Sequence, residues 1–226
     1  MIEELYNEYQ KLAKQSFQNI TIHEDHDNKN ILWNNDLYLS PSIRYGHIQY
    51  FKDENGRLEL MHSVFYPSFF KPLPIFGFDV IALGGKVTGI FCDFTKTPFQ
   101  IEALSRALKD LNHKYKDYVR VLPEWANFFS EDFVCISPVG LDEKELIKDF
   151  TDIFRCFIGY GNWEDYTGKY NKMEDVKQSI NTQNFYSLNQ RKNDKTSKAL
   201  AAYIGQEKAR NFIDNVMFPV YREDTF

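Results

Sequence analysis

The sequence predicts an α+β fold in which helices cover a central antiparallel β-sheet. The first observation behind this class is that strand-like segments follow one another directly through the first half of the chain. The second is a pair of tight-turn signals, Asn55-Gly56 and Gly84-Gly85, because such turns join antiparallel strands. The third is the helical spacing of apolar residues at the start of the chain and through its second half.

The elements of the first half can be placed in order. Ile2, Leu5, Tyr9 and Leu12 lie on one helical face and predict an amphipathic helix over residues 2–17. Alternating apolar and aromatic residues then predict strands near residues 30–39, 42–51, 57–66, 74–83 and 86–94.

After Pro98 the spacing of apolar residues becomes helical. Asp142 and Glu145 form a capping box, which predicts where a later helix begins. We expect a helix over 99–116, a strand near 133–138, a helix from Asp142 to about 158, a loop over 159–172, and helices over 170–190 and 196–216.

Composition bounds the class of protein. The 226 residues suffice for one sizeable core, so we expect residues 1–226 to form a single domain. The net charge of −5 argues against a broad nucleic-acid-binding face. We expect no membrane span and no signal peptide. Three widely spaced cysteines predict neither a disulfide framework nor a metal site, so we expect a cytoplasmic protein that binds no metal.

Familiar cofactor motifs are absent, since the sequence has no GxGxxG, Walker A, GxSxG or HExxH pattern. Polar residues inside strand patterns are the remaining candidates. A two-residue turn at Asn55-Gly56 would pair Gln49 with His62 and make His47 the diagonal neighbour. Because His62 alternates with apolar residues, the three side chains would meet on one sheet face. Two core histidines satisfied by hydrogen bonds are the alternative.

Asp79 stands inside the apolar segment PIFGFDVIAL, residues 74–83. Burial of a carboxylate costs free energy unless the group is paired or protonated. We therefore expect Asp79 to be buried and to have the raised proton affinity of a proton donor. A structural aspartate that bonds to the backbone is the alternative.

Two further segments carry charged candidates. Asn193, Asp194 and Lys195 open a predicted helix, where they would face a pocket and the lysine would pair with an anionic substrate group. A helix cap would also explain Asp194. Arg120 can hold a carboxylate through two parallel hydrogen bonds, and a surface ion pair is the alternative.

Taken together, four motifs resemble those of the ferredoxin-dependent bilin reductases. They are MHSVFYP (61–67), PLPIFGFD (72–79), RVLPEW with FFSE (120–131) and NQRKNDKT (189–196), in the family's order. The resemblance runs from about residue 43 to the end of the chain. It implies a three-layer α/β/α sandwich with a central antiparallel sheet, in agreement with the class derived from the residues.

The resemblance also implies an activity. It indicates an oxidoreductase that acts on CH–CH groups and reduces biliverdin IXα, bound between the sheet and the C-terminal helices, to a phytobilin. Electrons come one at a time from reduced [2Fe–2S] ferredoxin, through bilin radicals, and the protein holds no redox cofactor of its own. We expect a monomer whose partners are ferredoxin and biliverdin. A bilin carrier without catalysis is the alternative.

Residue roles follow from the resemblance. Asp79 matches the family's central proton-donating aspartate, His62 the histidine that works with it, and His47 the second histidine of that network. Asp194 matches an aspartate on the helical side of the pigment, which is a second proton donor in some members. The substrate-binding matches are Arg120 and Lys195 near the propionates, Thr88 beside them, and Gln190 and Asn193 in the helical segment.

Gln49 departs from the family pattern. The phycocyanobilin-forming members have a glutamate here, beside the D-ring vinyl group, and glutamine cannot deliver a proton as an acid does. We therefore expect a four-electron reduction with another regiochemistry. Phycoerythrobilin is the favoured product, and phycocyanobilin is the alternative.

Docking of an acidic ferredoxin requires a basic patch, because the chain itself is net negative. Two clusters are candidates: Arg191, Lys192 and Lys198, and Lys109, Lys114 and Lys116.

Overall fold

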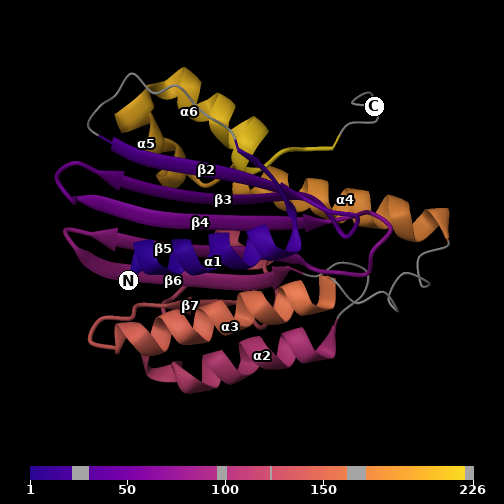
Figure 1. Cartoon of the computed structure of the whole chain (residues 1–226), viewed down its shortest axis with the longest axis horizontal. Helices are drawn as coiled ribbons and strands as arrows, with labels where there is room; N and C mark the ends of the chain where they lie inside the picture. The colour runs from indigo at the N-terminus through magenta and orange to yellow at the C-terminus, as the bar shows by residue number, and fades with distance from the viewer. Residues whose placement is uncertain (22–30, 96–100, 123, 162–171, 222–226) are drawn as a thin grey trace.

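The strands that the structure describes form one seven-stranded antiparallel sheet, in which they follow one another in sequence order (Figure 1). The structure is a computed structural model that describes residues 1–21, 31–95, 101–122, 124–161 and 172–221. The strands are β1 (Gln18–Thr21), β2 (Ile31–Leu39), β3 (Ile43–Asp53), β4 (Leu58–Pro67), β5 (Ile75–Leu83), β6 (Lys86–Thr95) and β7 (Val134–Ile136). All but β1 were expected from the sequence, and the four residues of β1 are too few to show an alternation.

Glycine turns join the central strands. Gly84 and Gly85, with φ of 58° and 75°, form the expected two-residue turn between β5 and β6. The β3–β4 connection is longer than expected and runs over residues 54–57, where the carboxylate of Asp53 accepts from the Leu58 N–H at 3.0 Å. The expected register is confirmed, with Gln49 paired to His62.

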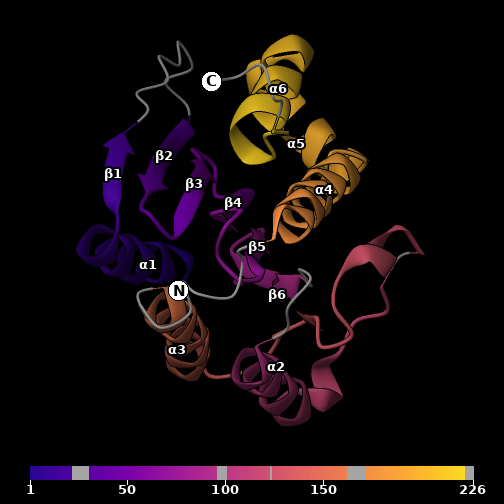
Figure 2. The same ribbon diagram turned by 90° about the vertical axis from the view of Figure 1, so that its right-hand side faces the viewer.

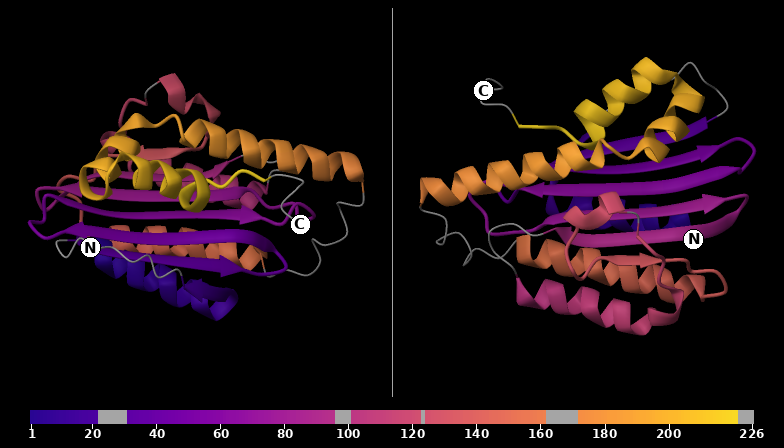
Figure 3. Two further views of the ribbon diagram at one scale, coloured as in Figure 1. Left: turned by 90° about the horizontal axis from the view of Figure 1, so that it is seen from above. Right: turned by 180° about the vertical axis from the view of Figure 1, so that it is seen from behind.

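Helices cover both faces of the sheet, which gives the predicted α/β/α sandwich (Figure 2). The helices α1 and α3 lie on one face with α2 beside them, and α4, α5 and α6 lie on the other (Figure 3). Their bounds are α1 Ile2–Ser16, α2 Glu102–Lys114, α3 Glu143–Gly161, α4 Met173–Gln190, α5 Asp194–Ile204 and α6 Gln206–Phe212, with short turns η1 Lys116–Tyr118, η2 Glu124–Phe128 and η4 Ile213–Met217.

The larger core lies between the sheet and the layer of α1 and α3. Phe76, Phe78 and Val80 of β5 are fully buried there. The ring of Phe154 from α3 stacks on Tyr9 from α1, with ring centroids 4.3 Å apart. Because side chains alternate between the faces of a strand, this packing turns Asp79 toward the opposite face.

A second, smaller core lies under the C-terminal helices. Val64 and Tyr66 of β4 pack there against Tyr186 of α4 and against Phe212 and Phe218. The aromatic residues at the end of the chain therefore cover the sheet face that carries His47 and His62.

The C-terminal region differs from the prediction of one helix over 196–216. Gly205, with φ of 83°, separates α5 from α6, and this left-handed conformation is one that glycine adopts without strain. The expected loop over 159–172 is partly wrong, because α3 continues to Gly161; residues 162–171 lie outside the described residues.

One half of the predicted capping box, the N-terminal cap by Asp142, is confirmed. The carboxylate of Asp142 accepts from the N–H groups of Lys144 and Glu145, at 2.8 and 3.1 Å. The Glu145 side chain pairs with Lys114 of α2 at 2.8 Å, so this residue links two helices. Within the described ranges, no helix has the length and apolar character needed to cross a membrane.

Candidate active site

A row of polar side chains crosses four neighbouring strands on the face that α4, α5 and α6 cover. The register pairs Asn35 with Gln49, Gln49 with His62, and His62 with Asp79. His47 is a diagonal neighbour, and its ring centroid lies 5.7 Å from that of His62. We call these five residues the polar row. It brings together His47, Gln49, His62 and Asp79, as the sequence predicted.

His62 and Asp79 form a direct pair. Nδ1 of His62 lies 2.8 Å from Oδ1 of Asp79, the geometry of an imidazole N–H that donates to a carboxylate. The side chain of His62 is 3% exposed, whereas that of Asp79 is 40% exposed. The prediction that Asp79 is buried is therefore wrong. Side chains alternate along β5, so Phe78 and Val80 point into the larger core and Asp79 points to the other face of the sheet. The carboxylate is paired and also open to a ligand.

His47 is held from the other end of the row. Its Nε2 lies 3.0 Å from Oδ1 of Asn35 on β2, and its side chain is fully buried. Burial lowers the pKa of His47 well below its ordinary value, and the neighbouring His62 lowers it further. His47 is consequently neutral at pH 7.

Several polar atoms of the row have no hydrogen-bond partner among the described residues. They are Nδ1 of His47, Nε2 of His62 and both amide atoms of Gln49. Buried polar atoms are nearly always hydrogen-bonded in folded proteins, so this cluster indicates a place that a polar ligand or water fills. The rings of Phe212 and Phe218 lie against the two histidines, with centroids 5.9 and 5.3 Å from them.

Tyr186 of α4 lies beside the row, although the sequence analysis did not select it. A Cβ added at Gly77 would come within 2.7 Å of its hydroxyl, so the glycine leaves room for this close approach. Gln190, predicted to bind substrate, donates from Nε2 to the same hydroxyl at 2.9 Å. Burial raises the pKa of Tyr186 well above its ordinary value, and the charge of Asp79 contributes to the shift. The tyrosine thus stays a neutral hydroxyl.

Thr88 and Arg120, predicted near the propionates, lie together. Nη1 of Arg120 donates to the backbone carbonyl of Thr88 at 3.2 Å, and the guanidinium lies 5.6 Å from the centroid of Phe91. Phe91 on β6 pairs with Asp79 on β5, so the guanidinium of Arg120 lies over the strand next to the row. The Thr88 hydroxyl donates to the carbonyl of Ile81. Because no carboxylate of the described chain pairs with Arg120, its charge is available to an anion.

The helix-opening residues make no hydrogen bond or ion pair with the row among the described residues. Asn193, not Asp194, caps α5, because its side chain accepts from the Lys195 N–H at 3.2 Å. The Asp194 carboxylate is 68% exposed and pairs with Lys198 at 2.5 Å. This ammonium lowers the pKa of Asp194, so the carboxyl is ionised at neutral pH and holds no proton to donate. Lys195 is exposed as well, so the predicted pocket-facing arrangement of these residues is not seen.

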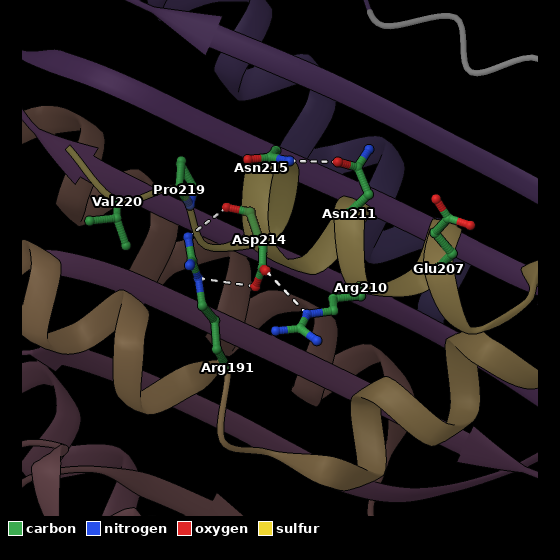
Figure 4. Close-up of a pocket in the computed structure, with 8 residues that line it drawn as sticks. All are labelled: Arg191, Glu207, Arg210, Asn211, Asp214, Asn215, Pro219 and Val220. Carbon is green, nitrogen blue, oxygen red and sulfur yellow. Dashed lines mark hydrogen bonds and ion pairs between the residues drawn. The ribbon is translucent and has the colours of Figure 1, made fainter. Parts of the chain in front are cut away.

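A hollow lies at the outer side of the C-terminal helices (Figure 4). Its lining residues are Arg191, Glu207, Arg210, Asn211, Asp214, Asn215, Pro219 and Val220, none of which belongs to the polar row. Arg191 pairs there with Asp214 at 3.4 Å and donates to the carbonyl of Phe218. The positive charge of Arg191 is therefore already compensated by a carboxylate of the protein.

Asp93 fixes the FFSE segment against β6. It is 1% exposed and accepts from the hydroxyls of Thr95 and Ser130 and from the backbone N–H of Ser130. Burial raises the pKa of Asp93 to about 6, against the opposing effect of these hydrogen bonds. The hydrogen bonds between Asp93 and Ser130 thus hold the segment that follows Arg120 against β6, beside the row.

Sequence reasoning missed three residues that shape this site: Asn35, Tyr186 and Asp93. Asn35 alternates with Trp33 and Leu37 along β2, so its face could be read from the strand pattern. The other two become visible only when α4 and the FFSE segment are placed on the sheet.

Comparison with known proteins gives one family. A sequence model described as ferredoxin-dependent bilin reductase matches residues 5–219. A phycocyanobilin:ferredoxin oxidoreductase of Prochlorococcus marinus is 31% identical over 197 residues, which cover 84% of this chain and 77% of the relative. The enzyme of the same name from Trichodesmium erythraeum is 26% identical and covers 85% and 78%.

Two solved structures share the fold. Tomato phytochromobilin synthase, crystallised with biliverdin, aligns with a TM-score of 0.75 at 15% identity, covering 96% of this chain and 82% of that one. The structure of PcyX aligns with a TM-score of 0.60 at 20% identity, covering 97% and 99%.

Proposed function

Because this chain belongs to the ferredoxin-dependent bilin reductases, we propose that it reduces biliverdin IXα to a phytobilin with electrons from reduced ferredoxin. The observation that carries this proposal is the polar row, in which a carboxylate, two imidazoles and an amide meet with unpartnered atoms on one sheet face. Biliverdin is the ligand of one structural neighbour and supplies the polar pyrrole and lactam atoms that such a site needs.

The proposed chemistry places the proton source at the Asp79–His62 pair. Each electron that reaches the bilin adds negative charge to it, and a proton from the pair then neutralises that charge. The 2.8 Å hydrogen bond lets the carboxylate stabilise a proton on the imidazole until it is needed. Because the two groups are coupled, they hold and release the proton as a unit.

The propionates are proposed to bind toward Arg120 and Lys195. The guanidinium of Arg120 has no carboxylate partner in the described chain and lies over Phe91, one strand from Asp79. Lys195 is the second residue of α5, and this helix covers the sheet face that carries Asp79 (Figure 3). Asp194, beside it, is the candidate for a second proton donor. This role requires that its pair with Lys198 opens and that the bound pigment buries the carboxyl, so that it takes up a proton.

The proposed product is phycoerythrobilin. Gln49 is fully buried and stands opposite His62 in the sheet, and an amide there cannot protonate a vinyl group as a carboxylic acid does. Phycocyanobilin is the competing product, since the curated relatives are named for it.

We also propose that the chain acts in the cytoplasm as a single-domain monomer. The thiols of Cys92, Cys135 and Cys156 are all free, which suits a reducing compartment.

The deciding experiment is anaerobic turnover of biliverdin with reduced ferredoxin, with the products resolved by chromatography against bilin standards. We expect consumption of biliverdin and a phytobilin that co-elutes with phycoerythrobilin. Pigment binding without turnover would identify a bilin carrier instead, and absence of any shift in biliverdin absorbance would contradict both readings.

A further inference from the structure

We propose that Asn35 is a positioning residue that holds the His47 ring as its Nε2–H tautomer and thereby presents the Nδ1 lone pair of His47 to the site. This inference deepens the proposed function and rests on it, because it gives the polar row a direction for proton movement. Its key residue belongs neither to the sequence motifs nor to the assigned roles.

The geometry fixes which nitrogen is engaged. The β2–β3 register places Asn35 opposite Gln49, two positions along β3 from His47. Oδ1 of Asn35 lies 3.0 Å from Nε2 of His47, and both side chains are buried. A carbonyl oxygen only accepts hydrogen bonds, so Nε2 must carry the proton. A neutral imidazole then has its lone pair at Nδ1.

The remaining nitrogen is buried and has no partner among the described residues. The two ring nitrogens of an imidazole point to different sides of the ring, so engagement of Nε2 by Asn35 turns Nδ1 away from that amide. On the next strand His62 is held the other way, since Asp79 takes its Nδ1 and leaves Nε2 unpartnered. Each histidine is thus fixed by its outer neighbour in the row and keeps one nitrogen for the site.

The two outer neighbours differ in charge. Asp79 is an acid whose carboxylate stabilises an imidazolium at His62, whereas the amide of Asn35 carries no charge for His47. The carboxylate partner makes His62, rather than His47, the place in the row for an extra proton, and His47 serves as the neutral acceptor. The lowered pKa of His47, caused chiefly by burial, agrees with this division.

The first test reads the tautomer directly. Two-bond ¹H–¹⁵N correlation spectra of the free protein at pH 7 are expected to show His47 protonated at Nε2 and bare at Nδ1. Asn35→Leu removes the acceptor, and we expect the Nδ1 resonance of His47 to move toward the protonated position. A wild-type His47 protonated at Nδ1, or a tautomer unchanged in Asn35→Leu, would overturn the proposal.

A second variant tests the charge of the partner. Asn35→Asp keeps an acceptor oxygen and adds a charge, so the titration midpoint of His47 is expected to rise by about 1 to 3 pH units. The matched control is Ser63→Ala, which removes a buried and unpartnered hydroxyl next to His62 in the chain but on the other face. That control should leave both His47 readouts unchanged. An equal shift in the control would overturn the proposal, because the effect would then be a general structural one.

These measurements need neither biliverdin nor ferredoxin. Failure of the wild-type protein to turn over biliverdin would therefore remove the proposed function and leave the tautomer result standing. A wild-type enzyme that turns over while His47 shows the other tautomer would remove only the role of Asn35.

Discussion

Asp79 and Asn35 hold the two histidines of the row from opposite ends, one with a charge and one without. At the residue scale, what matters is which groups can release a proton and which can only accept or donate a hydrogen bond. Gln49 belongs to the second kind, although it stands opposite His62.

Gln49→Glu tests the role of this amide. A carboxylic acid at a fully buried position beside His62 would retain a proton and could deliver it. We expect the product to shift from phycoerythrobilin toward phycocyanobilin, as measured by chromatography after anaerobic turnover. Gln49→Met, which has similar size and no acidic proton, is the control and should give no such shift. If the wild-type enzyme already forms mainly phycocyanobilin, the argument from Gln49 is wrong.

Asp194→Asn tests the second proton donor. We expect an altered product distribution or an arrest at a two-electron intermediate, because the second reduction would lack its proton. Lys198→Gln is the companion variant, since it removes the ammonium that lowers the pKa of Asp194. An unchanged product profile in Asp194→Asn would make this exposed carboxylate a surface partner of Lys198 and nothing more.

At the scale of elements, the site depends on how closely α4 lies on β5. The Tyr186 hydroxyl occupies the space that a side chain at residue 77 would need. Glycine at this position therefore sets the approach of the helix to the row.

Gly77→Ala is expected to lower the free energy of unfolding by about 1 to 3 kcal/mol, the usual cost of overpacking, and to weaken biliverdin binding as Tyr186 moves. Urea unfolding and absorbance titration measure the two effects. Gly159→Ala on α3 is the control, because its added Cβ meets nothing within 4 Å and alanine favours a helix. Equal behaviour of the two variants would refute this account of Gly77.

The elements also show what the sequence could predict. The β3–β4 register followed from Asn55-Gly56 because glycine turns constrain strand pairing, so the meeting of Gln49 with His62 was accessible. The connection at residues 40–42 has no such signal, so the position of Asn35 opposite Gln49 was not accessible. Gly205 shows the same limit, since an isolated glycine within a helical pattern does not reveal whether the helix breaks there.

At the scale of the whole molecule, carboxylates of the described chain pair with two of the three basic residues in each candidate docking cluster. Lys114 pairs with Glu145 and Asp149, and Lys109 lies 3.9 Å from Asp132, so carboxylates compensate much of that cluster. In the other cluster, Arg191 pairs with Asp214 and Lys198 with Asp194, whereas Lys192 bonds only to the neutral amide of Asn189 in the described chain and keeps its charge. We place the ferredoxin face at this cluster because it follows α4, which covers the sheet face of the polar row (Figure 2).

Lys192→Glu is therefore expected to raise the KM for ferredoxin, with a smaller effect at high salt because surface charges are screened. Turnover kinetics at several ionic strengths measure this. Lys116→Glu makes the same change of charge in the other cluster and is the control. A larger rise in the KM for ferredoxin in Lys116→Glu would place the docking face at the cluster of Lys109, Lys114 and Lys116 instead.

The account as a whole claims that the Asp79–His62 pair supplies protons to a bilin after each electron arrives. Asp79→Asn tests this most directly, with Asp110→Asn on the exposed surface of α2 as control. We measure biliverdin binding by absorbance and then anaerobic turnover with reduced ferredoxin. The account predicts that Asp79→Asn binds biliverdin, loses about 10²- to 10⁴-fold in turnover and accumulates a radical species, while the control behaves as wild type. If Asp79→Asn turned over biliverdin at the wild-type rate and formed the same product, this result would contradict the proposed role of the Asp79–His62 pair.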